Sequence, residues 1–253
     1  MTTNLVDFSG KQVLVTGASS GIGRETAILL SRLGASIVAT GRDPAALQQT
    51  LEFLQGDRHA AEAFDLSKVN EIPDWLLTLA QKHGRFDGVA HLAGRHEACA
   101  LKMAEPEFVA NLFQINVAAT IALVRGFRHR KVRHETSSVV LVSSVAALIG
   151  EAGISTYAAT KGAIVSLTKS LAAELAREKI RVNCVSPSLV KSELLDRLQQ
   201  NVAPEQFKKL EAAHLLGLGQ PIDVANAIAF LLSDACQWMT GTNLVLDGGY
   251  SLR

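Results

Sequence analysis

Seven short apolar runs rich in β-branched residues alternate with helical patterns from one end of the chain to the other. The runs cover 12–16, 36–40, 61–64, 88–92, 139–143, 181–185 and 243–246, and several are apolar at nearly every position. Such runs are typical of strands that helices cover on both faces. The helical patterns cover roughly 22–33, 44–55, 71–82, 106–130, 154–177, 192–200, 204–215 and 221–232. Strands separated by crossover helices predict an α/β fold with a doubly wound, parallel, seven-stranded sheet, whose ligands bind beyond the carboxyl ends of the strands.

Bulk properties exclude several kinds of protein. The 253 residues carry a formal net charge of +1, so nothing global indicates binding to nucleic acid or to an anionic membrane. The N-terminus lacks the pattern of a signal peptide, and no apolar run approaches the ~20 residues that a membrane span needs. Cys99, Cys184 and Cys236 have no metal-ligand spacing and fit buried thiols in a reducing cytosol. No repeat or linker interrupts the pattern, so we expect one domain over residues 1–253, in a soluble cytoplasmic protein without a metal site.

A glycine-rich turn, Thr16–Gly23, follows the first strand and opens the first helix. Glycines there let the backbone turn sharply and approach a pyrophosphate, whose charge the helix N-terminus stabilises. The alternative is a tight strand-to-helix connection without a ligand. The place of the turn in the first strand–helix–strand unit favours a dinucleotide site.

The end of the second strand bears on the choice of cofactor. A site selective for NAD usually has an acidic residue at this edge to bind the ribose hydroxyls, but Gly41 stands there and Arg42 follows. An arginine suits a ribose 2′-phosphate by its charge and its fork of donors. Asp43 weakens this interpretation, although it precedes Pro44 and more naturally caps the next helix. We therefore expect NADP(H) to be favoured over NAD(H), the alternative being a solvated arginine.

Tyr157 and Lys161 stand four residues apart in a predicted helix, so both side chains project from one face. A neighbouring positive charge lowers the pKa of a phenol, and a phenol tuned toward neutrality exchanges protons with a carbonyl or an alcohol. Ser144 ends an apolar run thirteen residues upstream. A tyrosine and a lysine also share an exposed helix face by chance, so this spacing gains its weight from the motifs around it.

Together these motifs resemble the short-chain dehydrogenase/reductase family. The resemblance rests on Thr16–Gly23, Asp65, Ala93–Gly94, Asn116, Ser144, Tyr157 and Lys161, with the segments 181–187 and 241–249, and it covers nearly the whole chain. It implies a Rossmann-type sheet. The overall pattern resembles 3-oxoacyl-[acyl-carrier-protein] reductases, but sugar, steroid and secondary-alcohol dehydrogenases share it.

The resemblance implies four catalytic residues. It implies that Tyr157 is the acid or base, and that Lys161 holds the nicotinamide ribose and lowers the tyrosine pKa. It also implies that Ser144 binds the substrate oxygen and that Asn116 helps to order a proton-relay water.

Cofactor contacts follow from the same resemblance, which implies that Asp65 and the backbone of Leu66 contact the adenine. The expected cofactor-binding residues are Gly17, Ser19, Ser20, Gly21, Ile22, Gly23, Arg42, Asp65, Leu66, Ala93, Gly94, Tyr157, Lys161, Pro187 and Val190.

Two positions depart from the family's pattern. The family's Asn-Asn-Ala-Gly is His91-Leu-Ala-Gly94 here, and its Pro-Gly is Pro187-Ser188. The first asparagine usually has a structural role, so we expect His91 to be a core polar group with satisfied hydrogen bonds. Ser188 lacks the conformational freedom of glycine, which predicts altered backbone contacts near the nicotinamide.

Residues 187–218 correspond to the family's substrate loop. Its apolar wall, with few charges, consists of Val190, Leu194, Leu195 and Leu198 beside Lys191 and Glu193. His96 and Glu151 are further candidates for the substrate site, with surface solvation as the alternative for each. None of these residues identifies a substrate.

A basic run, 125–134, contains Arg125, Arg128, Arg130, Lys131 and Arg133. Its simplest role is to end the long helix, where cations complement the helix dipole and stay solvated. The alternative is a docking site for an acidic carrier that presents a thioester-linked ketone.

Members of the family usually pair the helices that match 106–130 and 154–177 across a two-fold axis. The second of these helices carries more apolar surface here than one sheet face should cover, and the tail 244–253 is apolar. Closed symmetric assemblies use such self-complementary patches. We therefore expect a homotetramer, with a dimer as second choice and a monomer as the alternative.

The sequence thus predicts an NADP(H)-preferring oxidoreductase that transfers a hydride between nicotinamide and a small-molecule carbonyl or secondary alcohol, with a 3-oxoacyl thioester as one candidate. The alternatives are a sugar, steroid or other secondary-alcohol dehydrogenase, or a dinucleotide-sensing protein without turnover. The intact catalytic set argues against the sensor, because a sensor needs only the glycine-rich half.

Overall fold

A computed structural model describes residues 6–252 of the chain. Its seven strands form one parallel sheet in the order β3-β2-β1-β4-β5-β6-β7, so the strand order reverses between β1 and β4. The strands are β1 Gln12–Thr16, β2 Ser36–Gly41, β3 Ala60–Ala63, β4 Phe86–His91, β5 Arg133–Val142, β6 Ile180–Pro187 and β7 Asn243–Leu246. The predicted doubly wound sheet is confirmed, with β5 beginning six residues before its apolar run.

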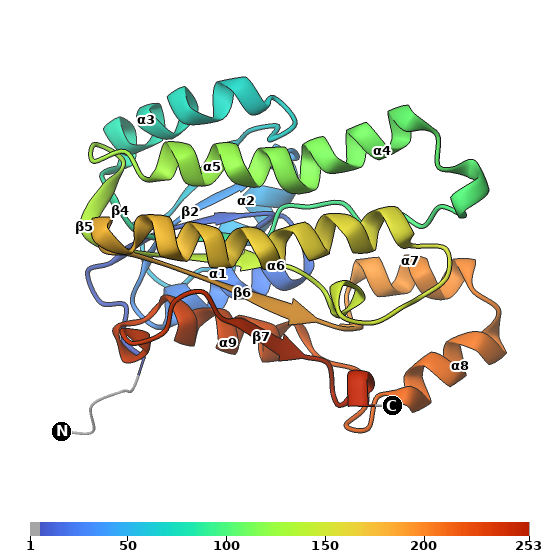
Figure 1. Cartoon of the computed structure of the whole chain (residues 1–253). Coiled ribbons are helices and arrows are strands. Elements are labelled where there is room, and N and C mark those ends of the chain that lie inside the picture. The colour runs from blue at the N-terminus through green and yellow to red at the C-terminus, as the bar shows by residue number, and fades with distance from the viewer. Residues whose placement is uncertain (1–5, 253) are drawn as a thin grey trace.

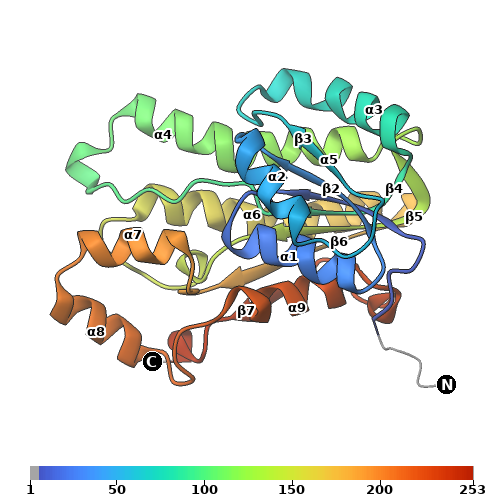
Figure 2. The ribbon, with the colours of Figure 1, turned by 180° about the vertical axis from the view of Figure 1, so that it is seen from behind.

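Helices cover both faces of the sheet (Figures 1 and 2). One face carries α3 Ile72–His83, α5 Ala119–Phe127 and α6 Ser155–Leu175, and the other carries α1 Gly21–Arg32, α2 Pro44–Glu52 and α9 Pro221–Leu232. Each face buries its own apolar cluster, with Phe86 and Phe127 in one and Phe8 and Leu30 in the other. Beyond the carboxyl end of β6 lie α7 Glu193–Asn201 and α8 Pro204–Ala213, at the right of Figure 1.

Prolines begin several of these helices. Pro106, Pro204 and Pro221 are the first residues of α4, α8 and α9, as the sequence predicts, and Pro44 begins α2 in the same way. The first turn of a helix tolerates proline because the N–H at that position has no partner within the helix.

The predicted helix over 106–130 is one long helix with a change of pitch inside it. It consists of α4 Pro106–Phe113, a π-helical turn Gln114–Ala118 and then α5. By length and composition Pro106–Phe127 is apolar enough to cross a membrane, with a mean hydropathy of 1.5 over a window that is 39% buried. Glu107, Asn116 and Arg125 interrupt this segment, so it is not a continuous apolar run. In this fold α5 contributes Leu123 and Phe127 to the core beside α3.

His91 ends β4 inside the core, where it is 3% exposed. Its Nδ1 lies 2.8 Å from Thr16 Oγ1 and its Nε2 lies 3.0 Å from Thr120 Oγ1. Because the Thr120 hydroxyl donates to the carbonyl of Asn116, it accepts from Nε2–H, which leaves Nδ1 to accept from Thr16. Burial, with the nearby charge of Lys161, lowers the pKa of His91 to about 3, so the ring is neutral. The expectation of a satisfied core histidine is confirmed.

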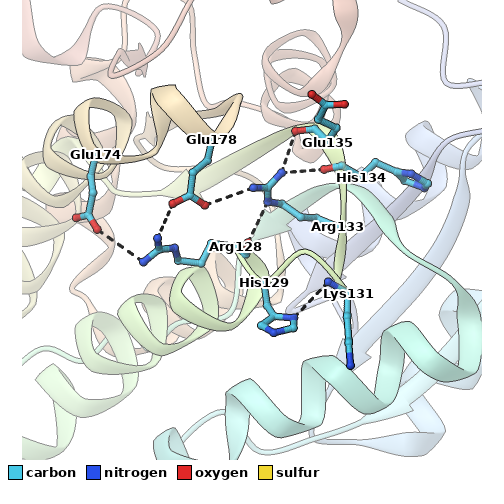
Figure 3. Close-up of polar contacts among 8 residues, drawn as sticks. All are labelled: Arg128, His129, Lys131, Arg133, His134, Glu135, Glu174 and Glu178. Carbon is cyan, nitrogen blue, oxygen red and sulfur yellow. Dashed lines mark hydrogen bonds and ion pairs between the residues drawn. The ribbon is translucent and has the colours of Figure 1, made fainter.

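The basic run leaves α5 and enters β5 (Figure 3). Arg133 is 5% exposed, and its guanidinium donates to the carbonyl oxygens of Arg128, His134 and Glu135 at 3.2, 2.9 and 2.9 Å. The carboxylate of Glu178, which follows α6, pairs with Arg133 at 3.4 Å and also binds Arg128. The hydrogen bond from Arg128 holds the pKa of Glu178 below its usual range. Two of the five cations are therefore paired within the chain.

The position of this run bears on its two interpretations. Arg133 begins β5, whereas Ser144 lies two residues past the end of the same strand. In the sheet Arg133 pairs with Phe86, and Leu141 pairs with His91. At about 3.3 Å per residue, Arg133 and Ser144 are therefore roughly 26 Å apart, at opposite ends of the strand. The geometry favours the simpler role, in which the run ends α5 and fixes the start of β5.

Arg133→Met should lower the free energy of unfolding by about 3 kcal/mol, because it leaves buried carbonyl groups and part of Glu178 without a partner. Arg130→Met, at an exposed position of the same run, is the matched control and should change stability by less than about 0.5 kcal/mol. Urea unfolding measures both. Equal losses in the two variants would show that Arg133 is no more than a solvated cation.

Candidate active site

The predicted site residues gather at one edge of the sheet. The glycine-rich turn follows β1, Arg42 follows β2, Asp65 follows β3, the Ala93–Gly94 pair follows β4, and Ser144 follows β5. Parallel strands present their carboxyl ends at a common edge, so residues far apart in the chain meet there. The residues lie on either side of the reversal between β1 and β4.

The turn after β1 packs tightly on itself and on the segment after β4, and leaves the first N–H groups of α1 without a side-chain cap. Gly17 has φ +70°, and a Cβ on it would lie 2.8 Å from the amide nitrogen of Ala93. A Cβ on Gly23 would lie 2.0 Å from the carbonyl oxygen of Gly17. Ser20, the N-cap of α1, makes no side-chain capping bond to the described residues. The first N–H groups of α1 are thus available to an anion, as a dinucleotide site requires.

The residues after β2 and β3 fit the adenosine end of a dinucleotide. Asp43 accepts from the amide groups of Ala45 and Ala46 at 2.9 and 3.2 Å, so it caps α2 as predicted. Arg42 is exposed and makes no ion pair with any residue in the described range 6–252. Asp65 accepts from the amide of Ser67 at 2.9 Å, which holds its pKa below the usual value. Arg42 therefore keeps its guanidinium free for a phosphate.

Tyr157 and Lys161 lie on the first turns of α6, 9% and 8% exposed. The Nζ of Lys161 donates to the carbonyl of Val142 at 2.8 Å and stands 5.8 Å from the centroid of the Tyr157 ring. The hydroxyl of Ser144 accepts from the amide of Ala146 at 3.2 Å and lies 3.5 Å from the carbonyl oxygen of Pro187. Ser144 thus follows the end of β5, and the ammonium of Lys161 binds the last carbonyl of the same strand.

Burial dominates the ionisation of this pair. It raises the pKa of Tyr157 to about 12, and a hydrogen bond with Ser144 opposes the rise only in part. It lowers the pKa of Lys161 to about 8. The expectation that Lys161 lowers the tyrosine pKa is therefore wrong for the protein without ligand, because the cost of burying a phenolate outweighs an ammonium that points at Val142.

Asn116 lies in the π-helical turn and is 3% exposed. Its Oδ1 accepts from the amide of Arg95 at 2.8 Å, and its Nδ2 donates to the carbonyl of Arg95 at 2.9 Å and to Thr160 Oγ1 at 3.0 Å. This amide group fixes the loop after β4 against α6, one residue before Lys161. In the described structure the side chain has a positioning role, and its carbonyl accepts from Thr120.

Ser188, His214 and Tyr250 form a contact that the sequence does not reveal. The Ser188 hydroxyl lies 2.8 Å from His214 Nε2, and the imidazole stacks on Tyr250 with centroids 4.5 Å apart. Nδ1 of His214 lies 2.7 Å from the carbonyl of Leu210, so Nε2 accepts from the serine. The backbone at Ser188 does not have positive φ, so no glycine is needed there. The residues lie too far apart in sequence for any local pattern to predict this contact.

The substrate segment after β6 is only partly an apolar wall. Val190 and Leu195 are buried at 7% and 6%, but Leu194 is 52% exposed. A cavity of about 930 Å³ separates the start of α1 from α7 and α8, lined by Gly21, Lys191, Ser192 and Phe207 among others. None of the four catalytic candidates lines it, so it adjoins the glycine-rich turn rather than the tyrosine.

His96 and Glu151 take different places. The ring of His96 lies edge to face with the ring of Tyr157, 4.6 Å between centroids. Burial raises the pKa of Glu151, and the charge of Glu151 adds to the burial that raises the pKa of Tyr250. His96 is thus at the tyrosine, and Glu151 is beside the C-terminal segment.

Comparison with known proteins agrees with this geometry. Residues 17–251 match the family model described as enoyl-(acyl carrier protein) reductase. The chain belongs to the short-chain dehydrogenase/reductase family. It is 31% identical, over 246 residues, to a 3-oxoacyl-[acyl-carrier-protein] reductase of Rickettsia felis, and the match covers 97% of this chain and 98% of that protein.

Solved structures of similar fold include further reductases. A short-chain type dehydrogenase/reductase from Mycobacterium ulcerans is 31% identical with a TM-score of 0.90, over 98% of this chain and 92% of that one. An actinorhodin polyketide ketoreductase with NADPH is 26% identical with a TM-score of 0.89, over 96% of this chain and 98% of that one. The chain is therefore an NAD(P)-dependent oxidoreductase of this family.

Lys161 should make stability depend on pH. Its pKa is about 8 in the folded protein and 10.5 ordinarily, so between these values the unfolded chain holds a proton that the folded protein has released. Stability then rises with pH in this window, by up to roughly 1.4 kcal/mol per unit. The free energy of unfolding of the wild type minus that of Lys161→Met should increase from about pH 8 to about pH 10 in urea titrations.

Lys169→Met is the matched control, since Lys169 is exposed on the same helix. The corresponding difference for this variant should stay flat across the window. A flat difference for Lys161→Met as well would mean that the lysine is solvated in solution.

Proposed function

We propose that the protein is an NADP(H)-preferring oxidoreductase that transfers a hydride between the nicotinamide and a carbonyl or secondary-alcohol substrate. The observation that carries the proposal is the meeting of Ser144, Tyr157 and Lys161 at the sheet edge that also holds the glycine-rich turn. A protein that only senses dinucleotides does not require these three side chains. The membership of the family and the named relatives support the same reaction class.

The residues of the chain fit the dinucleotide in three places. The first N–H groups of α1, which have no side-chain cap among the described residues, suit the pyrophosphate. Asp65 and Leu66 suit the adenine, and the ammonium of Lys161 suits the hydroxyls of the nicotinamide ribose. When bound, the cofactor supplies or accepts the hydride.

In the direction of reduction, the chain supplies the proton. The Tyr157 hydroxyl holds its proton at neutral pH, because its pKa is about 12, and donates it to the substrate oxygen. The Ser144 hydroxyl donates a hydrogen bond to the same oxygen and stabilises the charge that develops there. The nearby ammonium of Lys161 stabilises the phenolate left on Tyr157. In oxidation the same atoms act in reverse order.

For the substrate, we propose a small carbonyl compound of which a 3-oxoacyl thioester is one form. The Rickettsia felis relative is named for 3-oxoacyl groups on a carrier protein, and the NADPH-bound neighbour is a polyketide ketoreductase. In the basic run 125–134, Glu178 pairs with Arg128 and Arg133, whereas the other three cations make no ion pair with residues 6–252 and stay available to an acidic carrier.

Tyr157→Phe tests the proposal directly. The variant keeps the ring but removes the transferable proton, so turnover should fall by about 100-fold or more, the scale of general acid catalysis. Stopped-flow measurement of hydride transfer with a panel of ketones gives the rate, and the dissociation constant of the cofactor should be unchanged. Near-normal turnover in Tyr157→Phe would refute the assignment, and absence of turnover in the wild type would favour the sensor.

Arg42→Ala tests the preference for NADP(H). Removing the guanidinium should weaken NADPH about 10- to 100-fold and NADH little, because only NADPH carries the 2′-phosphate. Arg58→Ala, an exposed arginine just before β3 and so at the far edge of the sheet, is the control and should leave both affinities unchanged. Equal losses of NADPH and NADH in Arg42→Ala would contradict the preference.

We also propose a homotetramer with two-fold axes. The exposed face of α6 consists mostly of small residues, such as Ala159, Ser166 and Ala173, beside Lys169 and Glu174. Exposed apolar side chains lie on α5, at Ile121, and near the C-terminus, at Val245 and Leu252. Light scattering at micromolar concentration should give about four times the chain mass of 27.0 kDa. A mass equal to one chain would exclude the assembly.

A further inference from the structure

The imidazole of His96 lies against the catalytic tyrosine. Its ring centroid is 4.6 Å from that of Tyr157, and the two planes meet at 68°. His96 follows β4, on the loop that leaves Gly94, whereas Tyr157 comes from α6. Two segments more than sixty residues apart therefore place a second polar ring at the point where the proton is transferred.

The backbone beside His96 is held in place. Asn116 binds both the amide and the carbonyl of Arg95, at 2.8 and 2.9 Å. Arg95 in turn pairs with Glu97 through Nε and Oε2 at 2.8 Å. Residue 96 lies between these two anchored neighbours, so its ring has a defined position relative to Tyr157.

The charged and titratable groups around His96 keep its imidazole neutral. Burial, together with the positive charge of Lys161, lowers its pKa below 6.5, and Glu97 opposes this shift only in part. Tyr157, the remaining titratable neighbour, keeps its proton. A neutral imidazole presents one N–H donor and one acceptor. Within residues 6–252 neither ring nitrogen of this half-buried side chain has a hydrogen-bond partner, so both are free to bind a ligand.

We infer that His96 determines specificity by donating a hydrogen bond to a second oxygen of the substrate, placed 1,3 to the reacting carbonyl. The inference rests on the proposed function, in which Tyr157 and Ser144 bind the reacting oxygen. Because the imidazole packs on the tyrosine ring, its N–H and the Tyr157 hydroxyl belong to neighbouring rings and suit two oxygens of one substrate. A 3-oxo ester or thioester has that pair of oxygens, and a simple ketone lacks the second one.

The test compares two substrates of equal chain length in the full-length enzyme. Ethyl acetoacetate carries the ester oxygen, and 2-heptanone replaces the ester group by methylenes. His96→Phe should lower kcat/KM for ethyl acetoacetate by about tenfold, the scale of one hydrogen bond in a desolvated site, with most of the loss in KM. The same variant should leave kcat/KM for 2-heptanone within about twofold.

A conservative variant separates hydrogen bonding from packing. His96→Gln retains an N–H donor and should recover most of the activity on ethyl acetoacetate that His96→Phe loses. Equal losses on both substrates, or no loss on either, would overturn the inference, because His96 would then only pack against Tyr157 or play no part. If the wild type reduces neither ketone, the proposed function and the inference both fail. If the wild type reduces 2-heptanone, the proposed function stands and the variants test the role of His96 alone.

Discussion

The site depends on one buried amide, that of Asn116, and on the π-helical turn that carries it. A π turn widens the helix by one residue, and such turns are frequent at functional sites. Here it directs the amide into the space between the loop after β4 and α6, where it binds Arg95 twice and Thr160 once. All hydrogen-bonding capacity of the amide nitrogen is used. This link holds the loop bearing His96 in register with Tyr157 and Lys161, together with the hydrogen bond from the amide of Cys99 to the carbonyl of Gly153 at 2.7 Å.

Burying Lys161 and Tyr157 at this site costs free energy, which the rest of the fold must offset. Lys161 is buried as a cation whose direct partner is the carbonyl of Val142, and its lowered pKa measures that penalty. Tyr157 is buried as a neutral phenol, and its raised pKa makes the phenolate costly before any ligand binds. Both shifts have the same cause, which is removal from water. The two apolar clusters on either face of the sheet supply the stability that tolerates such groups.

Local patterns in the sequence predict the fold and the principal residues of the site. The apolar runs predict all seven strands, and four-residue spacing places Tyr157 and Lys161 on one face of α6. Other features depend on contacts between distant segments, which a single sequence does not encode locally. The π turn has no compositional signal, and the contact between Ser188 and His214 joins residues 26 apart. The direction of the tyrosine pKa was also missed, because spacing shows that a charge is near but not how deeply the phenol is buried.

The basic run and the catalytic residues lie at opposite ends of β5. Its amino end begins with Arg133, whose guanidinium donates to backbone carbonyls and pairs with Glu178. Its carboxyl end leads to Ser144. The basic run is therefore distant from the reacting part of a substrate, and the groups that contact that part lie at the carboxyl edge. Of the polar side chains that reach this edge, His96 is the one in contact with the tyrosine ring and without a protein partner in the described structure, which makes it the group most able to distinguish one ketone from another.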